Sequence, residues 1–182
     1  DIVCKISEYI KQLNVASTVS DMMLIEAKAR QLYYTSFNII LEKEDFKFEQ
    51  RTKRPPEDAI NASISFGNTL LYNSFSNIIW KKGIDPRFGV VHASNRRSQS
   101  LNLDFADIFK PIIVDRIIFT MINKKMLVLL TDFEKAGQGV YLSKEGKNIF
   151  IQMYEEKLKS KITVKGKEMT YRQLMEKELQ SY

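Results

Sequence analysis

Three side chains with the chemistry of metal ligands lie close together in the sequence. His92 is the only histidine, and Asp104 and Asp107 follow it by twelve and fifteen positions. The two aspartates are three residues apart and therefore share one face of a helix. Carboxylates and water suit hard cations such as Mg²⁺, and an added imidazole nitrogen shifts the preference towards Mn²⁺. These residue types predict a site for Mg²⁺ or Mn²⁺.

A second interpretation needs no metal. Two acids beside an apolar stripe are costly to bury unless a cation meets them, and an arginine or lysine side chain can supply that charge. In this case His92 caps or packs a turn, and Asp104 and Asp107 are solvated or salt-bridged. The pattern of one histidine and two aspartates leaves both interpretations open.

Two basic clusters accompany these residues and could bind phosphate. They are Arg51, Lys53 and Arg54, and then Asn95, Arg96 and Arg97 directly after His92. The chain has 28 basic and 22 acidic residues, which gives a net charge of +6. A positive surface favours a polyanion such as the DNA backbone. The alternative is that each cluster is an ordinary solvated loop.

The elements that would position these residues are helices. Apolar residues recur every three or four positions over 1–14 and 21–41, a spacing typical of amphipathic helices. The charged segment 42–54 lacks this periodicity and is expected to be an exposed loop. The pair Pro55 and Pro56, followed by Glu57 and Asp58, predicts the entry of a helix that runs to about residue 82, because proline is tolerated in a first turn and acids there complement the helix dipole.

Two residues indicate breaks or close contacts within the helices. Gly67 lies inside the helix expected up to residue 82, where glycine costs about 1 kcal/mol relative to alanine, so a close backbone approach is expected there. Apolar periodicity resumes at Leu101, and Pro111 is expected to kink or divide that helix. The fold class predicted from these patterns is all-α.

Length and composition indicate one domain over residues 1–182. At 182 residues with 44% hydrophobic residues, the chain can bury a core, and it has no apolar run of about 18 residues, so no membrane contact is expected. A single cysteine, Cys4, suits a cytoplasmic location. The first residue, Asp1, suggests a fragment. The charged segment 155–182 is expected to be a terminal helix or, alternatively, to bind a partner.

Several ordered motifs resemble one known family. They are RPPEDAINA at 54–62, SFG at 65–67, LLY at 70–72, GIDP at 83–86, GVVH at 89–92 and SLNLDFAD at 100–107, with EAKAR upstream at 26–30. Together they resemble the CRISPR-associated Cas1 family, the integrase of the adaptation complex. The motifs fall within residues 22–150, and their order is more specific than any one of them.

The resemblance implies roles for individual residues. Glu26, His92 and Asp107 match the family's metal ligands, and Asp104 matches an acidic neighbour on the same helix. Tyr72 matches a tyrosine near the site, and Asn61 matches a family asparagine whose role the sequence does not explain. Two positions depart from the pattern: Ala27 replaces a common glycine, and Asp107 stands where many members have glutamate, although neither change removes a donor atom.

The same resemblance implies a function and partners. A 3′ hydroxyl of captured DNA would attack a phosphodiester of the CRISPR repeat, and water in its place would give endonuclease activity. The intact proteins carry an amino-terminal β-rich domain, form homodimers and assemble with the small Cas2 subunit. Two alternatives remain: a catalytically idle scaffold that binds DNA, and a transposon-borne integrase relative with the same site.

Overall fold

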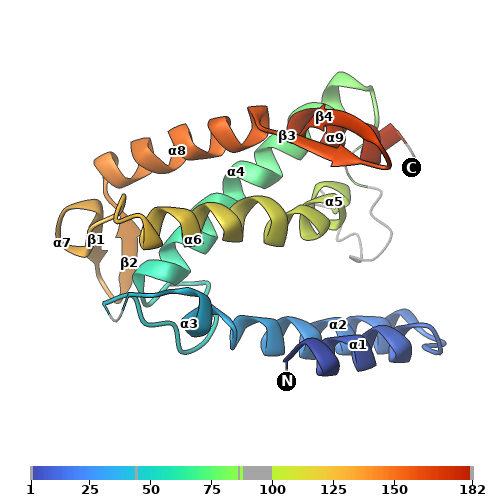
Figure 1. Cartoon of the computed structure of the whole chain (residues 1–182), viewed down its shortest axis with the longest axis horizontal. Coiled ribbons are helices and arrows are strands. Elements are labelled where there is room, and N and C mark those ends of the chain that lie inside the picture. Colours follow the sequence, from blue (N-terminus) through green and yellow to red (C-terminus); the bar gives the residue numbers. More distant parts are fainter. Residues whose placement is uncertain (1, 44, 86, 88–99, 181–182) are drawn as a thin grey trace.

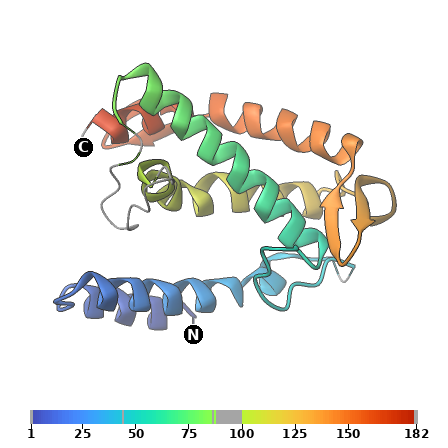
Figure 2. The same ribbon diagram turned by 180° about the vertical axis from the view of Figure 1, so that it is seen from behind.

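Helix α4 runs through the centre of the fold and organises the helices around it (Figures 1 and 2). The computed structural model describes residues 2–43, 45–85, 87 and 100–180. In that part of the chain the elements are α1 (Ile2–Leu13), α2 (Val19–Tyr34), α3 (Phe37–Ile40), α4 (Ala59–Lys81), α5 (Leu101–Phe109), η1 (Lys110–Asp115), α6 (Arg116–Asn123), α7 (Leu129–Asp132), β1 (Phe133–Ala136), β2 (Gly139–Leu142), α8 (Lys144–Lys159), β3 (Lys161–Val164), β4 (Lys167–Thr170) and α9 (Tyr171–Gln180).

The core forms where α4 packs against α5, η1 and α8. The ring of Phe75 on α4 stacks on Phe105 of α5 with centroids 5.8 Å apart and lies 5.3 Å from Phe109. The expected change at Pro111 is confirmed, because the helix becomes a six-residue π-helix, η1, at Lys110 and returns to α-helix at Arg116. The predicted all-α class is confirmed as a mostly helical fold.

The entry of α4 differs in detail from the prediction. The helix begins at Ala59, and Asp58 is its N-cap, whose side chain accepts a hydrogen bond from the backbone N–H of Asn61. Pro55 and Pro56 therefore precede the helix instead of occupying its first turn. An acidic N-cap satisfies a free N–H and complements the helix dipole, which is a sufficient start signal without proline.

Helices α1 and α2 form a hairpin along one side of the molecule (Figure 1). Neither helix contains a buried residue. The carboxyl end of α2 is fastened by aromatic contacts, since the ring of Phe37 lies 5.2 Å from those of Tyr34 and Phe48 and 4.8 Å from that of Phe119.

The expectation that 42–54 is an exposed loop was wrong at Phe46 and Phe48, which are buried.

Two short antiparallel hairpins, β1–β2 and β3–β4, were not predicted. The second turns at Lys165 and Gly166, both with positive φ, which is typical of a two-residue hairpin turn. It lies within the segment 155–182, which also holds the end of α8 and all of α9. Leu174, Met175 and Leu179 of α9 are buried, so this segment is part of the packed fold.

Within the ranges that the structure describes, no helix combines the length and the apolar character needed to cross a membrane.

The close approach expected at Gly67 is confirmed. A Cβ atom at this position would lie 2.5 Å from Val114 Cγ1 of η1 and 2.8 Å from Phe150 Cζ of α8. Both neighbours are fully buried. The absence of a side chain therefore allows α4 to contact η1 and α8 at once.

We predict that Gly67→Ala destabilises the protein by about 1–3 kcal/mol, because the added methyl overpacks the core more than the helix propensity of alanine compensates. Urea denaturation would measure the free energy of unfolding. Asn77→Ala, at an exposed position of the same helix, is the matched control and should be neutral or slightly stabilising. Equal effects of the two substitutions would contradict the close packing.

Candidate functional site

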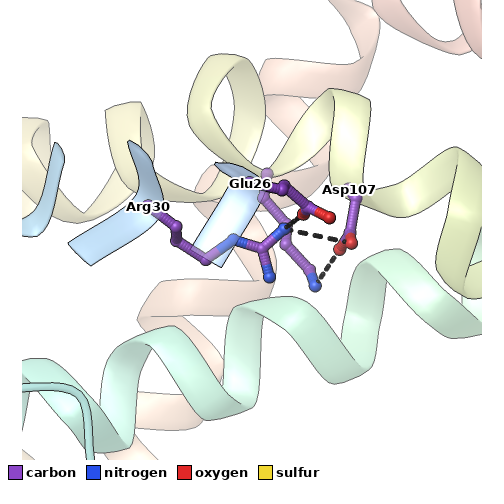
Figure 3. A network of polar contacts seen from close by, with 4 residues as sticks. Glu26, Arg30 and Asp107 are labelled. Atoms are coloured by element: carbon purple, nitrogen blue, oxygen red, sulfur yellow. Dashed lines mark hydrogen bonds and ion pairs between the residues drawn. The ribbon is translucent and has the colours of Figure 1, made fainter. Parts of the chain in front are cut away.

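Glu26 and Asp107 come from distant parts of the chain and meet at one arginine. Nη2 of Arg30 contacts Glu26 Oε1 and donates a hydrogen bond of 3.1 Å to Asp107 Oδ2. Glu26 and Arg30 are one turn apart on α2, so both side chains face α5, which carries Asp107 (Figure 3). The predicted convergence of these two carboxylates is therefore present in the fold.

Asp107 has a second cationic neighbour. Lys110 Nζ contacts Asp107 Oδ1, and both side chains are only 16% exposed. Burial alone would raise the pKa of Asp107, but Lys110 and Arg30 hold it below the usual value. Burial lowers the pKa of Arg30, yet Asp107 and Glu26 outweigh burial and raise it. Asp107 is therefore paired with an arginine and a lysine in this structure, as the second interpretation of the acidic residues expects.

A cavity of about 750 Å³ opens beside these residues. Five cationic side chains line it: Arg30, Arg51, Lys53, Arg54 and Lys110. Glu26 and Tyr72 also line the cavity, whereas the lining excludes Asp107, which lies behind Arg30 and Lys110. Lys110 Nζ lies 4.9 Å from the centroid of the Tyr72 ring. The predicted cluster of Arg51, Lys53 and Arg54 is therefore placed around the candidate site.

The nearby cations affect the pKa of Lys53. Burial, followed by the charges of Arg51, Lys110 and Arg30, lowers the pKa of this lysine. Each nearby positive charge disfavours another, and an anion bound among them would relieve this repulsion. The cavity is therefore suited to a phosphate group.

A buried carboxyl group lies beneath the site. Asp115, the last residue of η1, is 4% exposed, and Tyr33 of α2 donates a hydrogen bond of 3.1 Å to its Oδ2. Burial raises the pKa of Asp115 to about 7, although Tyr33 and the charges of Lys110, Arg51 and Arg30 act in the opposite direction. Asp115 thus connects η1 to α2 below the cation-lined cavity.

Some predicted residues are not placed by the structure. His92, Asn95, Arg96 and Arg97 lie outside the described residues. Asp104 is partly buried on α5, one turn before Asp107. Among the residues that are described, no group of three or more potential ligands could hold a metal ion. The ligand set of Glu26, His92 and Asp107 therefore remains a prediction.

The donor atoms present fit a divalent cation as far as they are described. Two carboxylates from different helices converge on a single positively charged atom, Nη2 of Arg30. Carboxylate oxygens are the ligands that Mg²⁺ and Mn²⁺ prefer, and His92 would add the nitrogen. A metal ion at these oxygens would have to compete with Arg30 and Lys110 for them.

Arg30, Lys110 and Asp115 are site residues that were not predicted from the sequence. Signals for them were present, since Arg30 follows Glu26 by four positions and Lys110 follows Asp107 by three, which are the spacings of helical ion pairs. Asp115 lies in the apolar run IIVDRIIF at 112–119, where a lone acid predicts a buried polar contact.

Comparison with known proteins shows the family of the chain. The sequence model of the family described as CRISPR associated protein Cas1 matches residues 1–156. The chain belongs to the Cas1 family. CRISPR-associated endonuclease Cas1 2 of Thermodesulfovibrio yellowstonii is 46% identical over 181 residues, which cover 98% of this chain and 54% of that relative. The chain thus spans about half the length of the curated Cas1 relatives that it matches.

Solved structures share the fold over nearly the whole chain. A Cas1 protein from Thermotoga maritima is 38% identical and superposes with a TM-score of 0.90, covering 97% of this chain and 55% of that one. A casposase bound to integration product has a TM-score of 0.88 at 19% identity, covering 96% of this chain and 52% of its own. The latter likeness concerns the fold alone.

We predict that Asp115→Asn makes the protein more stable than the wild type at neutral pH. Asp115 has a folded pKa of about 7 against about 3.9 when unfolded, so between these values the folded state keeps a proton that the unfolded state loses. The wild type therefore loses stability as pH rises through this window. Asparagine still accepts the hydrogen bond from Tyr33 but has no proton to lose.

Urea denaturation at pH 5, 6, 7 and 8 measures this difference. The advantage of Asp115→Asn should grow with pH by up to a few kcal/mol. A difference between variant and wild type that stays constant over the series would contradict a buried, protonated Asp115.

Proposed function

We propose that this chain is the catalytic part of a CRISPR adaptation integrase, which joins captured DNA to the CRISPR repeat by metal-dependent transesterification and also cleaves DNA. The observation that carries the proposal is the convergence of Glu26 and Asp107 beside a cation-lined cavity. Family membership supports it, since curated relatives covering most of this chain are named as Cas1 endonucleases. Because the chain spans about half of those relatives, activity of this part is itself part of the proposal.

The residues of the chain would divide the work between binding and chemistry. Glu26, His92 and Asp107, with Asp104 beside them, would hold Mg²⁺ or Mn²⁺, whose charge stabilises the negative charge that develops on the attacked phosphate. Lys53 and Arg54, both exposed at the cavity, would bind DNA phosphates on either side of the reacting one. Holding the 3′ hydroxyl and the phosphodiester together would supply a further part of the rate enhancement.

Further contacts and partners follow from the same proposal. Tyr72 lines the cavity and would contact the DNA next to Lys110. Asn95, Arg96 and Arg97 would bind the backbone from the segment that carries His92. In the intact protein we expect a homodimer and a complex with Cas2. One chain of a Cas6-RT-Cas1–Cas2 complex has the same fold over 20% of its length, with a TM-score of 0.86 at 23% identity.

We predict that Glu26→Gln and Asp107→Asn each lower Mn²⁺-dependent nicking of a branched DNA duplex by at least about 100-fold. Loss of a residue that only supports a metal ligand typically lowers activity by about 10- to 100-fold, and loss of the ligand itself should lower activity at least as much. DNA binding in EDTA should not weaken, because neither substitution removes a cation from the cavity. Gel analysis of the products and fluorescence anisotropy would measure the two quantities.

Glu49→Gln is the matched control, since Glu49 lines the same cavity and is outside the proposed ligand set. It should nick DNA at the wild-type rate. Equal nicking by the wild type and both ligand variants, with all proteins folded by circular dichroism, would refute the assignment.

The idle scaffold is a second candidate that one observation favours. Arg30 and Lys110 already neutralise Asp107 and separate it from the cavity. Such ion pairs can be purely structural. A scaffold would bind DNA through the cations without turning it over.

Calorimetry with Mn²⁺ on the wild type and His92→Ala separates the two candidates. We predict that the wild type binds Mn²⁺ and that His92→Ala, while folded, binds it at least about tenfold more weakly, because the imidazole is a preferred Mn²⁺ ligand. The absence of Mn²⁺ binding in both proteins, with or without DNA, would favour the scaffold.

A further inference from the structure

Asn61 is the family-matched residue whose role the sequence leaves unexplained. It lies in the first turn of α4 and is fully buried. A buried amide needs partners for two donor hydrogens and two acceptor lone pairs, or it destabilises the fold. The partners that it has therefore indicate what it does.

All four hydrogen-bonding positions of the Asn61 side chain are used. Oδ1 accepts from Arg51 Nη1 at 2.8 Å and from the backbone N–H of Thr52 at 2.9 Å. Nδ2 donates to the backbone oxygen of Gln50 at 2.8 Å and to Asp58 Oδ2 at 2.6 Å. Turning the amide over would set donor against donor and acceptor against acceptor, so this network fixes its orientation.

Three of these four partners are consecutive residues of the segment 50–54. Asn61 therefore fastens this segment to the start of α4. Arg51 reinforces the attachment, because its Nη2 donates to Ser65 Oγ one turn further along α4 at 2.9 Å. The guanidinium of Arg51 is thus hydrogen-bonded to side chains of α4. The remaining positive charges of the segment belong to residues that follow Arg51.

Those remaining charges are Lys53 and Arg54. Both are exposed, and both line the cavity of the candidate site as well as a second cavity of about 400 Å³ that also has Lys147 and Tyr141 in its wall. The segment 50–54 is therefore a wall shared by the two cavities, and its exposed cations Lys53 and Arg54 line both.

We propose that Asn61 is a positioning residue for DNA binding: it fixes the segment 50–54 so that Lys53 and Arg54 hold backbone phosphates at the mouth of the candidate site. This inference rests on the proposed function, because it assumes DNA as the ligand. It assigns Arg51 to the anchor and leaves phosphate binding in this segment to Lys53 and Arg54. Asparagine is suited to this position because aspartate lacks the two donors and alanine lacks all four contacts.

The first test concerns the anchor and needs no DNA. In Asn61→Ala, hydrogen exchange of the Thr52 N–H should accelerate by at least about tenfold, because it loses its acceptor. Ser63→Ala is the matched control: Ser63 is buried on the same helix and bonds only within it, to Ala59 O at 2.8 Å among the contacts described. Unchanged exchange at Thr52 in a folded Asn61→Ala protein overturns the proposal, whatever the protein does with DNA.

The second test measures affinity for a labelled branched DNA duplex over a series of KCl concentrations. Asn61→Ala should bind about tenfold more weakly, with a log–log salt slope smaller by about one or two phosphate contacts. Lys53→Ala/Arg54→Ala should show a similar loss, and adding Asn61→Ala to that double variant should change little further, because both act through the same contacts. A purely structural role would give additive losses and an unaltered slope, which overturns the proposal.

Two further outcomes keep the test decisive. If Asn61→Ala does not fold, Asn61→Asp carries the test, since it keeps the volume and both acceptor contacts but loses the donors to Gln50 and Asp58. It should weaken DNA binding and lower the salt slope, and adding Asp58→Asn should partly recover both, because it restores a donor between the two side chains. The Thr52 N–H keeps its acceptor in this variant, so faster exchange there would report the loss of the Gln50 and Asp58 contacts. If the wild type binds no DNA, the proposed function fails first, and the exchange result still decides whether Asn61 anchors the segment.

Discussion

The position of α2 relative to α5 depends on an ion pair as well as on the partly buried aromatic residues of α2. Helix α2 has no buried residue, and its aromatic anchors are at its carboxyl end. Further up the helix, Arg30 reaches Asp107, and its side chain is 37% exposed. The Arg30 end of this pair is open to solvent, which screens the pair, although the Asp107 side chain is only 16% exposed. Glu26 is therefore brought to Asp107 by a contact weak enough for another cation or an anion to rearrange.

The charges around this contact are unevenly distributed. Cations line the cavity, while the carboxylates of Asp107 and Asp115 lie behind or beneath them. Asp115 is partly protonated near neutral pH, with a pKa of about 7, so it offsets less positive charge than an ionised aspartate would. Positive charge that is incompletely balanced from within the protein is most readily balanced by an anion from outside. This distribution of charge favours a polyanion at the cavity.

Sequence patterns predicted the parts of this protein that depend on local periodicity. The long helix α4, the close approach at Gly67 and the change of helix at Pro111 follow from residues within a few positions of one another. The hairpins were missed because each strand has four residues, which is too short for an alternating pattern to stand out. The burial of Phe46 and Phe48 was missed because it depends on partners outside their own segment: Phe48 packs against Tyr34 and Phe37, and Phe46 against Phe133.

For the site, family resemblance indicated Glu26, Asp107 and Asn61 but not the partners of Asn61. Asn61 bonds to the backbone of residues 50 and 52, and such bonds leave no mark in side-chain identity. The sequence left a choice between metal and side-chain cations at the acidic pair, and these need not exclude each other. Arg30 and Lys110 border both Asp107 and the cavity. If a metal ion took the carboxylates, the same two cations would become available to phosphate, so the ion pairs of the free protein are compatible with the proposed function.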